Sequence, residues 1–192
     1  MDCHKLKFVI DIIFIISEKI FSKLDKLLPV YIQYYQELIQ AEIELAQITE
    51  KHKILNIGSG SIPASCILLA KETTTKIIGI DKNLESVKRS QKILSRLNLE
   101  GRVEIIHANA MNFPMNDSDI IIITNGINPY HELLERVAKD MRNDATVVFR
   151  TFSHHNEEVA PKDYFLKKFF TIGQKTYHKK SRSLVSVLLY KK

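Results

Sequence analysis

Short runs rich in Ile and Val follow one another along the chain from residue 53, and helical patterns separate them. The runs are KILNI, KIIGI, VEII, DIIII and TVVF. The segments between them predict helices over Ala64–Lys71, Leu84–Leu97 and Tyr130–Met141. Strands that alternate with helices imply right-handed crossovers and a parallel sheet. The runs are apolar on both faces, as expected where helices cover both sides of the sheet.

Two further runs near the C-terminus, FFTIG and LVSVLLY, predict two more strands, and we expect the last to be an antiparallel edge strand. The whole pattern predicts an α/β fold, namely a Rossmann-like, doubly wound sheet with a short N-terminal helical cap. We assign residues 1–50 to the cap and residues 51–192 to the sheet domain.

A proline divides the predicted cap. Residues 6–50 contain no glycine and one proline, Pro29. Apolar and aromatic residues recur at three- and four-residue steps from Tyr31 to Leu45, which is helical spacing. Proline disfavours a helical conformation in the residue before it, so we predict two helices that meet near Pro29.

Composition and charge narrow the class of protein. The 192 residues suffice for one domain, and 45% hydrophobic with 26% charged residues is ordinary for a globular protein. The net charge is +6, and residues 161–192 hold nine Lys or Arg against one acidic residue, Asp163. Such a basic tail can bind nucleic acid, but we favour a solvated lysine-rich face.

The sequence favours a cytoplasmic protein without a metal site. The two cysteines, Cys3 and Cys66, are typical of reduced thiols and have no partners at metal-ligand spacing, and the seven histidines are scattered. The apolar run FVIDIIFIIS has about half the length that spans a bilayer, and Asp11 interrupts it. No small-residue cleavage site follows, so we predict neither a membrane segment nor a signal peptide.

The stretch ILNIGSGSIPAS joins the first predicted strand to a helix. In a doubly wound sheet the ligand lies at the carboxyl ends of the strands, which places this turn in the site. Gly58 and Gly60 permit close approach of a ligand to the backbone around Ser59. Pro63 stands where a dinucleotide loop has its third glycine, which weakens the case for a pyrophosphate. Ser61 can cap the helix, with the proline in its first turn.

Two polar residues follow the next two strands. Asp81, 23 residues after Gly58, can accept hydrogen bonds from both ribose hydroxyls, although Asp is also a good helix cap. The side-chain carbonyl of Asn109 can accept from an adenine amino group, although taken alone this Asn is more often a turn residue. Together with the loop they predict an adenosine pocket. S-adenosylmethionine is the commonest ligand of that kind, and NAD remains an alternative.

The residues that we assign to the donor site are Gly58, Ser59, Gly60, Pro63, Asp81, Lys82, Asn109, Ala110 and Asn125. The nearby INPY, Ile127 to Tyr130, is similar to the N-P-P-Y box of methyltransferases that act on exocyclic amines of nucleic-acid bases. One proline is missing and the preceding strand ends too early for that motif. We therefore disfavour base methylation and place Asn125 at the pocket instead.

The chain resembles the catalytic part of nicotianamine synthase and its archaeal and bacterial relatives, over residues 30–192. Two motifs carry the resemblance: the loop IGSGSIPASCILLA, and YQELIQAE from Tyr35 to Glu42, which fits the family pattern Y-x-E-L-L/I-x-x-E. DIIIITNGINP and VVFRTFS are similar to the family's fourth strand and to its fifth strand followed by R-T. The resemblance implies a class I methyltransferase fold with S-adenosylmethionine as co-substrate.

The resemblance also implies an unusual reaction. In this family an amine attacks the methylene of the aminocarboxypropyl arm, and methylthioadenosine leaves. The sulfonium makes either carbon electrophilic, so geometry selects the one attacked. The family's catalytic tyrosine corresponds to Tyr35, which would position or deprotonate the amine or bind the donor's amino group. Without the resemblance, Tyr35 would be interpreted as a packing residue of an amphipathic helix.

The chain departs from the family in its short N-terminal region. The family has a longer helical domain that supplies a catalytic carboxylate, and Asp11 and Glu18 are the candidates here. We expect transfer to a small amine or amino acid. The alternatives are methyl transfer to a small molecule or RNA, and a non-catalytic module that binds S-adenosylmethionine.

Overall fold

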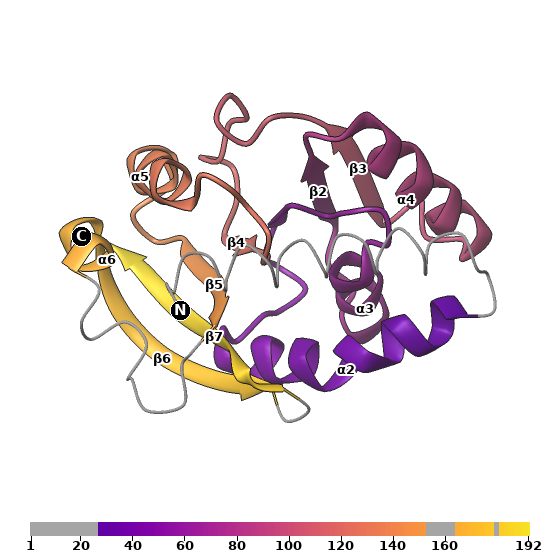
Figure 1. The fold of residues 1–192 in the computed structure, drawn as a ribbon, viewed down its shortest axis with the longest axis horizontal. Helices are drawn as coiled ribbons and strands as arrows, with labels where there is room; N and C mark the ends of the chain where they lie inside the picture. Colours follow the sequence, from indigo (N-terminus) through magenta and orange to yellow (C-terminus); the bar gives the residue numbers. More distant parts are fainter. Residues whose placement is uncertain (1–26, 153–163, 179–180) are drawn as a thin grey trace, which may run out of the picture.

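The computed structural model describes residues 27–152, 164–178 and 181–192. Seven strands form one sheet in the order β3-β2-β1-β4-β5-β7-β6 (Figure 1). The strands are β1 Ile54–Ile57, β2 Ile77–Asp81, β3 Val103–His107, β4 Ile120–Ile123, β5 Thr146–Phe152, β6 Phe170–His178 and β7 Ser181–Lys191. Strands β1 to β5 pair in parallel, and β7 is antiparallel to both of its neighbours.

Helices cover both faces of the sheet, as the doubly apolar runs predict. They are α2 Leu28–Leu45, α3 Ala64–Glu72, α4 Leu84–Arg96, α5 Tyr130–Asp140 and α6 Tyr164–Phe169. Helices α2, α3 and α4 contribute to one hydrophobic core cluster, and α5 and α6 to the other (Figure 1). All four residues of β1 and of β4 are buried, because these central strands are covered on both sides.

The prediction that the last strand is an antiparallel edge strand is correct in direction and wrong in position. The last strand, β7, is antiparallel, but it lies between β5 and β6, so the edge is β6. The reason is burial. Every residue of β7 from Leu184 to Leu189 is buried, as expected for a strand inside the sheet, whereas β6 is buried only at its two end residues, Phe170 and His178.

The helix predicted after Pro29 is confirmed, because α2 begins at Leu28 with the proline in its first turn. Proline fits there since the first amide hydrogens of a helix have no partner within it. The helix expected before Pro29 lies outside the described residues, as do Asp11 and Glu18. No helix within the described part of the chain is both long enough and apolar enough to cross a bilayer.

An ion pair inside the protein joins α2 to the sheet. Arg150 on β5 donates to both carboxylate oxygens of Glu42, from Nε to Oε1 at 2.7 Å and from Nη2 to Oε2 at 2.6 Å. Its Nη1 donates to Ser65 Oγ on α3 at 2.8 Å, and Ser186 Oγ on β7 donates to Glu42 Oε1 at 2.5 Å. The Glu42 side chain is 0% exposed, so the pair holds two charges away from water.

Burial by itself would lower the pKa of Arg150. The carboxylate of Glu42 outweighs that effect, by charge and by hydrogen bonds, and smaller charge interactions with Tyr35 and Cys66 add to it, so the pKa is raised above its ordinary value. Arg150 therefore stays charged, and its positive charge depends on Glu42 for compensation.

Replacing Glu42 with alanine should lower the free energy of unfolding by about 3–5 kcal/mol, because the Arg150 charge would remain buried without its partner. Urea denaturation measures this. Glu44→Ala, an exposed glutamate on the same helix, is the matched control and should change stability by less than about 0.5 kcal/mol. Equal effects of the two substitutions would contradict the account of the pair.

Candidate active site

The loop after β1 is shaped by two left-handed glycines. Gly58 has φ +80° and Gly60 has φ +70°. The amides of Gly58 and Ser59 both donate to the carbonyl of Ile80 on β2, at 2.9 and 3.0 Å. A Cβ at Gly58 would lie 2.6 Å from Thr124 Oγ1, which is too close for any side chain. Glycine is thus required at position 58 by both its backbone conformation and its neighbour.

Thr124 fastens this loop to the end of β4. Its hydroxyl lies 3.0 Å from the carbonyl of Ile57 and 2.8 Å from that of Gly58, both of which accept from it. Our sequence analysis did not single out this residue. The available signal was a hydroxyl residue directly after the apolar run DIIII, at the edge of the sheet where the glycine turn also lies.

The structure brings Asp81 to the glycine loop. Its Oδ2 accepts from the amide of Gly60 at 2.9 Å, and its Oδ1 accepts from the amide of Asn83 at 2.8 Å. The alternative that Asp81 caps the next helix is wrong, because the N-cap of α4 is Asn83, whose side chain accepts from Ser86 N at 3.1 Å. The half-buried carboxylate is therefore at the loop, as a ribose-binding group requires.

Two neighbouring residues, Ser61 and Pro63, differ from expectation in detail. Ser61 does not cap α3; its hydroxyl donates to Ser86 Oγ at 3.1 Å, and the N-cap residue is Pro63 itself, not a residue of the first turn. The buried hydroxyl of Ser59 has no hydrogen-bond partner among the described residues. Ser59 and Pro63 are both buried, so any contribution they make to a ligand comes through the backbone shape of the loop.

The loops that follow β2 and β3 lie side by side. The amide of Ala108 donates to the carbonyl of Asp81 at 3.0 Å. Asn109 Oδ1 accepts from the amide of Met111 at 3.0 Å, so this side chain forms the local turn that was its alternative interpretation. Ala110 is half-buried and packs against the second core cluster.

Two apolar side chains at these loops escaped the sequence analysis. Leu84 follows Asp81 and is 45% exposed, and Met111 follows Ala110 and is 36% exposed. Single exposed apolar side chains are common on protein surfaces, so these two are candidates for ligand contact only because they lie beside the polar loops. Both appeared in the sequence as ordinary members of helical or loop segments, so nothing distinguished them there.

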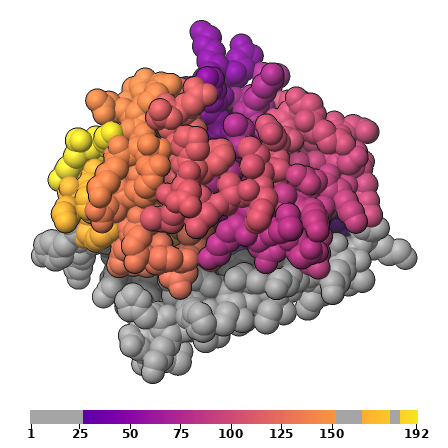
Figure 2. Space-filling view, turned by 90° about the horizontal axis from the view of Figure 1, so that it is seen from above, coloured from indigo at the N-terminus to yellow at the C-terminus, as the bar shows by residue number. Residues whose placement is uncertain are grey.

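The loop after β4 closes the site on the other side. Asn125 is half-buried, and Gly126 has φ +81° with open space where a Cβ would point. Lys82, from the end of β2, reaches across to donate to the carbonyl of Asn128 at 3.5 Å. The strand order places the loops of β2, β1 and β4 next to one another, so Lys82 and Asn125 lie on either side of the glycine turn. Seen from above, the middle of the chain (pink and red) occupies the centre of the face, between orange residues on one side and magenta residues on the other (Figure 2).

Tyr35 lies on the face of α2 that packs on the core. Its ring centroid is 5.2 Å from that of Tyr31 and 5.3 Å from that of Tyr34, and its side chain is half-buried. It is near enough to Arg150 for the phenol, when ionised, to raise the pKa of that guanidinium. Arg150 itself donates to Ser65, two residues after Pro63.

Other kinds of chemistry find little support in the described residues. Among them, no three His, Cys, Asp or Glu side chains gather as a metal site would require. Burial raises the pKa of the Cys66 thiol to about 12, only partly offset by Arg150, so it is protonated at neutral pH and unsuited to act as a nucleophile.

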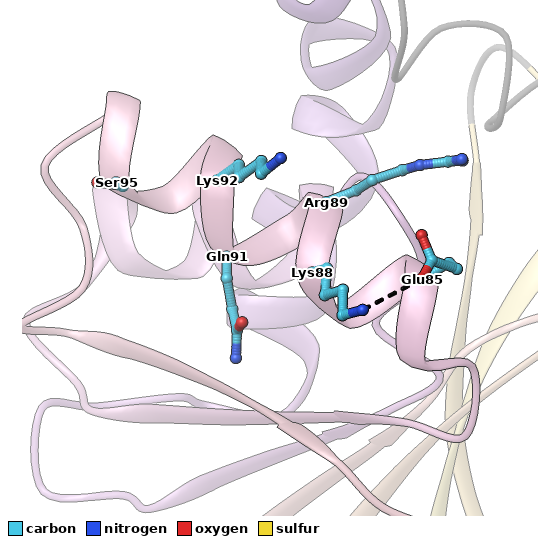
Figure 3. Close-up of a pocket in the computed structure, with 6 residues that line it drawn as sticks. All are labelled: Glu85, Lys88, Arg89, Gln91, Lys92 and Ser95. Carbon is cyan, nitrogen blue, oxygen red and sulfur yellow. Dashed lines mark hydrogen bonds and ion pairs between the residues drawn. The ribbon is translucent and has the colours of Figure 1, made fainter.

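A separate open hollow of about 460 Å³ lies along α4. Its lining includes Lys88, Arg89, Lys92 and the carboxylate of Glu85, which pairs with Lys88 at 3.4 Å (Figure 3). These long side chains belong to one helix and point into solvent, so we interpret the hollow as a solvated basic surface.

Comparisons with known proteins extend this picture. L-histidine 2-aminobutanoyltransferase of Pseudomonas aeruginosa (strain UCBPP-PA14) is 25% identical over 121 residues, which cover 62% of this chain and 46% of that protein. The chain therefore spans less than half the length of the curated relatives it matches.

Solved structures share the fold. A mutant of MtNAS in complex with S-adenosylmethionine matches with a TM-score of 0.72 and 17% identity, over 83% of this chain and 62% of that one. A Methanococcus maripaludis protein described as an S-adenosyl-L-methionine-dependent methyltransferase matches with a TM-score of 0.71 and 16% identity, over 92% of this chain and 93% of that one. The sheet is therefore that of the class I methyltransferase fold, as expected.

The family model for nicotianamine synthase protein matches residues 13–169, a range that contains the tyrosine helix, the glycine loop and the Arg-Thr pair of the fifth strand. With most of its 192 residues inside that match, the chain belongs to the nicotianamine synthase family.

Proposed function

We propose that this protein transfers the 3-amino-3-carboxypropyl group of S-adenosylmethionine to an amine and releases methylthioadenosine. The observation that carries the proposal is the family match over residues 13–169, which includes both the glycine loop and the tyrosine helix. The two cysteines, which are typical of reduced thiols, support a cytoplasmic location. The division into a cap, residues 1–50, and a donor-binding domain, residues 51–192, is part of the same proposal.

The residues at the strand ends fit an adenosine-containing donor. Asp81 can accept from the ribose hydroxyls while its other contacts hold the loop at Gly60. The exposed side chains of Leu84 and Met111 are available to contact the adenine, and the backbone and side chain at Asn109 can meet its edge. The open space at Gly126 leaves room beside the glycine turn for the donor's amino acid arm.

The donor supplies a sulfonium that activates the adjacent carbons. The acceptor nitrogen gives its electron pair to the methylene carbon, the carbon–sulfur bond breaks, and its electron pair remains on the sulfur of the departing methylthioadenosine. The protein must hold the nitrogen in line with that bond, and the proton that the nitrogen loses passes finally to solvent. Tyr35 is the group proposed to position or deprotonate the amine, or to bind the donor's amino group, and hydrogen-bond reach is sufficient for it.

The acceptor is proposed to be a small amine or amino acid. The relatives named L-histidine 2-aminobutanoyltransferase and the MtNAS structure in complex with MTA and tNA support this class. Methyl transfer to a small molecule or RNA is the second candidate, because a methyltransferase shares the fold over nearly its whole length. The two reactions release different nucleosides, so one assay separates them.

Incubation with S-adenosylmethionine and a pool of amino acids should yield methylthioadenosine and an acceptor heavier by the four-carbon arm. Mass spectrometry of the nucleoside and amino acid fractions measures both. A reaction without protein is the necessary control, because S-adenosylmethionine also decays to methylthioadenosine unaided. S-adenosylhomocysteine as the nucleoside product would overturn the proposal in favour of methyl transfer, and binding without any product would favour a non-catalytic module.

Tyr35→Phe should fold normally, because it keeps the ring that packs against Tyr31 and Tyr34. If the hydroxyl handles the acceptor's proton, turnover should fall by roughly 10²-fold or more while donor affinity changes less. Steady-state kinetics and calorimetric titration measure the two quantities. Tyr34→Phe on the same helix is the matched control, and equal losses in both variants would return Tyr35 to a packing role.

Asp81→Ala should weaken binding of S-adenosylmethionine by about 1–3 kcal/mol, because the ribose loses a charged acceptor. Asp81→Asn keeps an oxygen for the Gly60 amide and so tests the charge apart from the loop. Isothermal titration measures both. Asp117→Ala, an exposed aspartate paired with Lys53, is the control. Unchanged affinity in both Asp81 variants would show that the ribose lies elsewhere.

A further inference from the structure

We infer that Arg150 is a positioning residue, which holds the tyrosine helix and the donor loop at a fixed separation by binding Glu42 and Ser65 with one guanidinium. The inference rests on the proposed function, because it assigns a catalytic task to Tyr35. Neither Glu42 nor Ser65 is part of the glycine turn itself. Arg150 acts through the elements that it joins.

The three hydrogen bonds of the guanidinium reach two different helices. Two of them, at 2.7 and 2.6 Å, bind the carboxylate of Glu42 on α2, and the third, at 2.8 Å, binds Ser65 in the first turn of α3. Arg150 lies opposite Ser186 in the β5–β7 register, and the Ser186 hydroxyl binds the same carboxylate at 2.5 Å. Two neighbouring strands of the sheet, β5 and β7, therefore bind Glu42, and β5 also binds Ser65.

Helix geometry carries this constraint from Glu42 to Tyr35. The two residues are seven positions apart, which is nearly two turns and about 10 Å along the axis, so they share one face of α2. Leu38 and Ile39 lie between them on the core side and are 1% and 0% exposed. A slip of one residue would turn the helix by about 100° and remove both Tyr35 and Glu42 from the sheet.

Stability alone does not require an ion pair at this place. Two well-packed apolar side chains of similar size are often at least as stabilising as a buried ion pair, because charges lose their hydration on burial. The bidentate contact supplies direction and distance instead, which a pair of flexible apolar chains lacks.

The test replaces the pair with methionines, in the variant Glu42→Met/Arg150→Met of the full chain. This variant should fold, as judged by thermal unfolding, and should bind S-adenosylmethionine within about threefold of the parent. Its turnover should fall by about 10²-fold, since a displaced reacting group has a cost of that order. Arg150→Lys keeps the charge but not the bidentate contact, so its turnover should lie between that of the parent and that of the methionine-pair variant. The exposed pair on α5 gives the control, Glu135→Met/Lys139→Met, with unchanged turnover.

A cycle with Tyr35→Phe separates positioning from general damage. If Arg150 acts through the Tyr35 hydroxyl, the methionine pair should reduce turnover by less than about threefold in the Tyr35→Phe background. A full 10²-fold loss in both backgrounds, or no loss in the parent background, overturns the inference.

A second measurement does not depend on turnover. In protein labelled at the tyrosine Cζ carbons, the Tyr35 signal is identified by its disappearance in Tyr35→Phe. It should shift or broaden in the methionine-pair variant and stay in place in Glu135→Met/Lys139→Met. An unmoved signal overturns the positioning role even if no transfer reaction is observed, whereas a moved signal in a protein without turnover refutes the proposed function alone.

Discussion

The contact between Glu42 and Arg150 is the interaction on which the arrangement of the molecule depends. It joins residues 108 positions apart, one in the tyrosine helix and one in the fifth strand, and it holds their charges where water does not reach. A buried charge that loses its partner is costly, so neither side chain can leave without the other. The helix is consequently fixed in rotation and in position along its axis, which a purely apolar contact would allow to vary.

The loops at the strand ends are held differently, by hydrogen bonds that involve backbone amides and carbonyls. The Gly58 and Ser59 amides bind β2 through Ile80, Thr124 binds two carbonyls at the end of β1, and Asp81 binds the Gly60 amide. The shape of the turn therefore follows from the neighbouring strands. The donor loop and the tyrosine helix are two separately braced parts, and Arg150 bonds directly to α2 and to α3, the helix that follows the loop.

The elements could be predicted from the sequence because their signals are local. Runs such as KIIGI, and the helical spacing after Pro29, need no knowledge of distant residues, and the fold that they predict is confirmed. Contacts between residues that are distant in the sequence could not be predicted in this way. The position of β7 between two strands, the hydroxyl of Thr124 on the β1 carbonyls, and Ser61 binding Ser86 instead of capping α3 all depend on partners far along the chain. The motifs containing Glu42 and Arg150 were recognised, but not that they bind each other.

The sheet cannot by itself select which carbon of a sulfonium is attacked, because the same fold occurs in MtNAS and in a protein described as an S-adenosyl-L-methionine-dependent methyltransferase. Strand order and the glycine turn place an adenosine, and either carbon beside the sulfur is then accessible in principle. Selection must come from the group that places the acceptor nitrogen, and on this chain the candidate is carried by α2. The register of α2 is set by the buried carboxylate of Glu42 together with the buried side chains of Leu38 and Ile39. The chemistry proposed for this protein therefore depends on an ion pair that takes no part in the reaction.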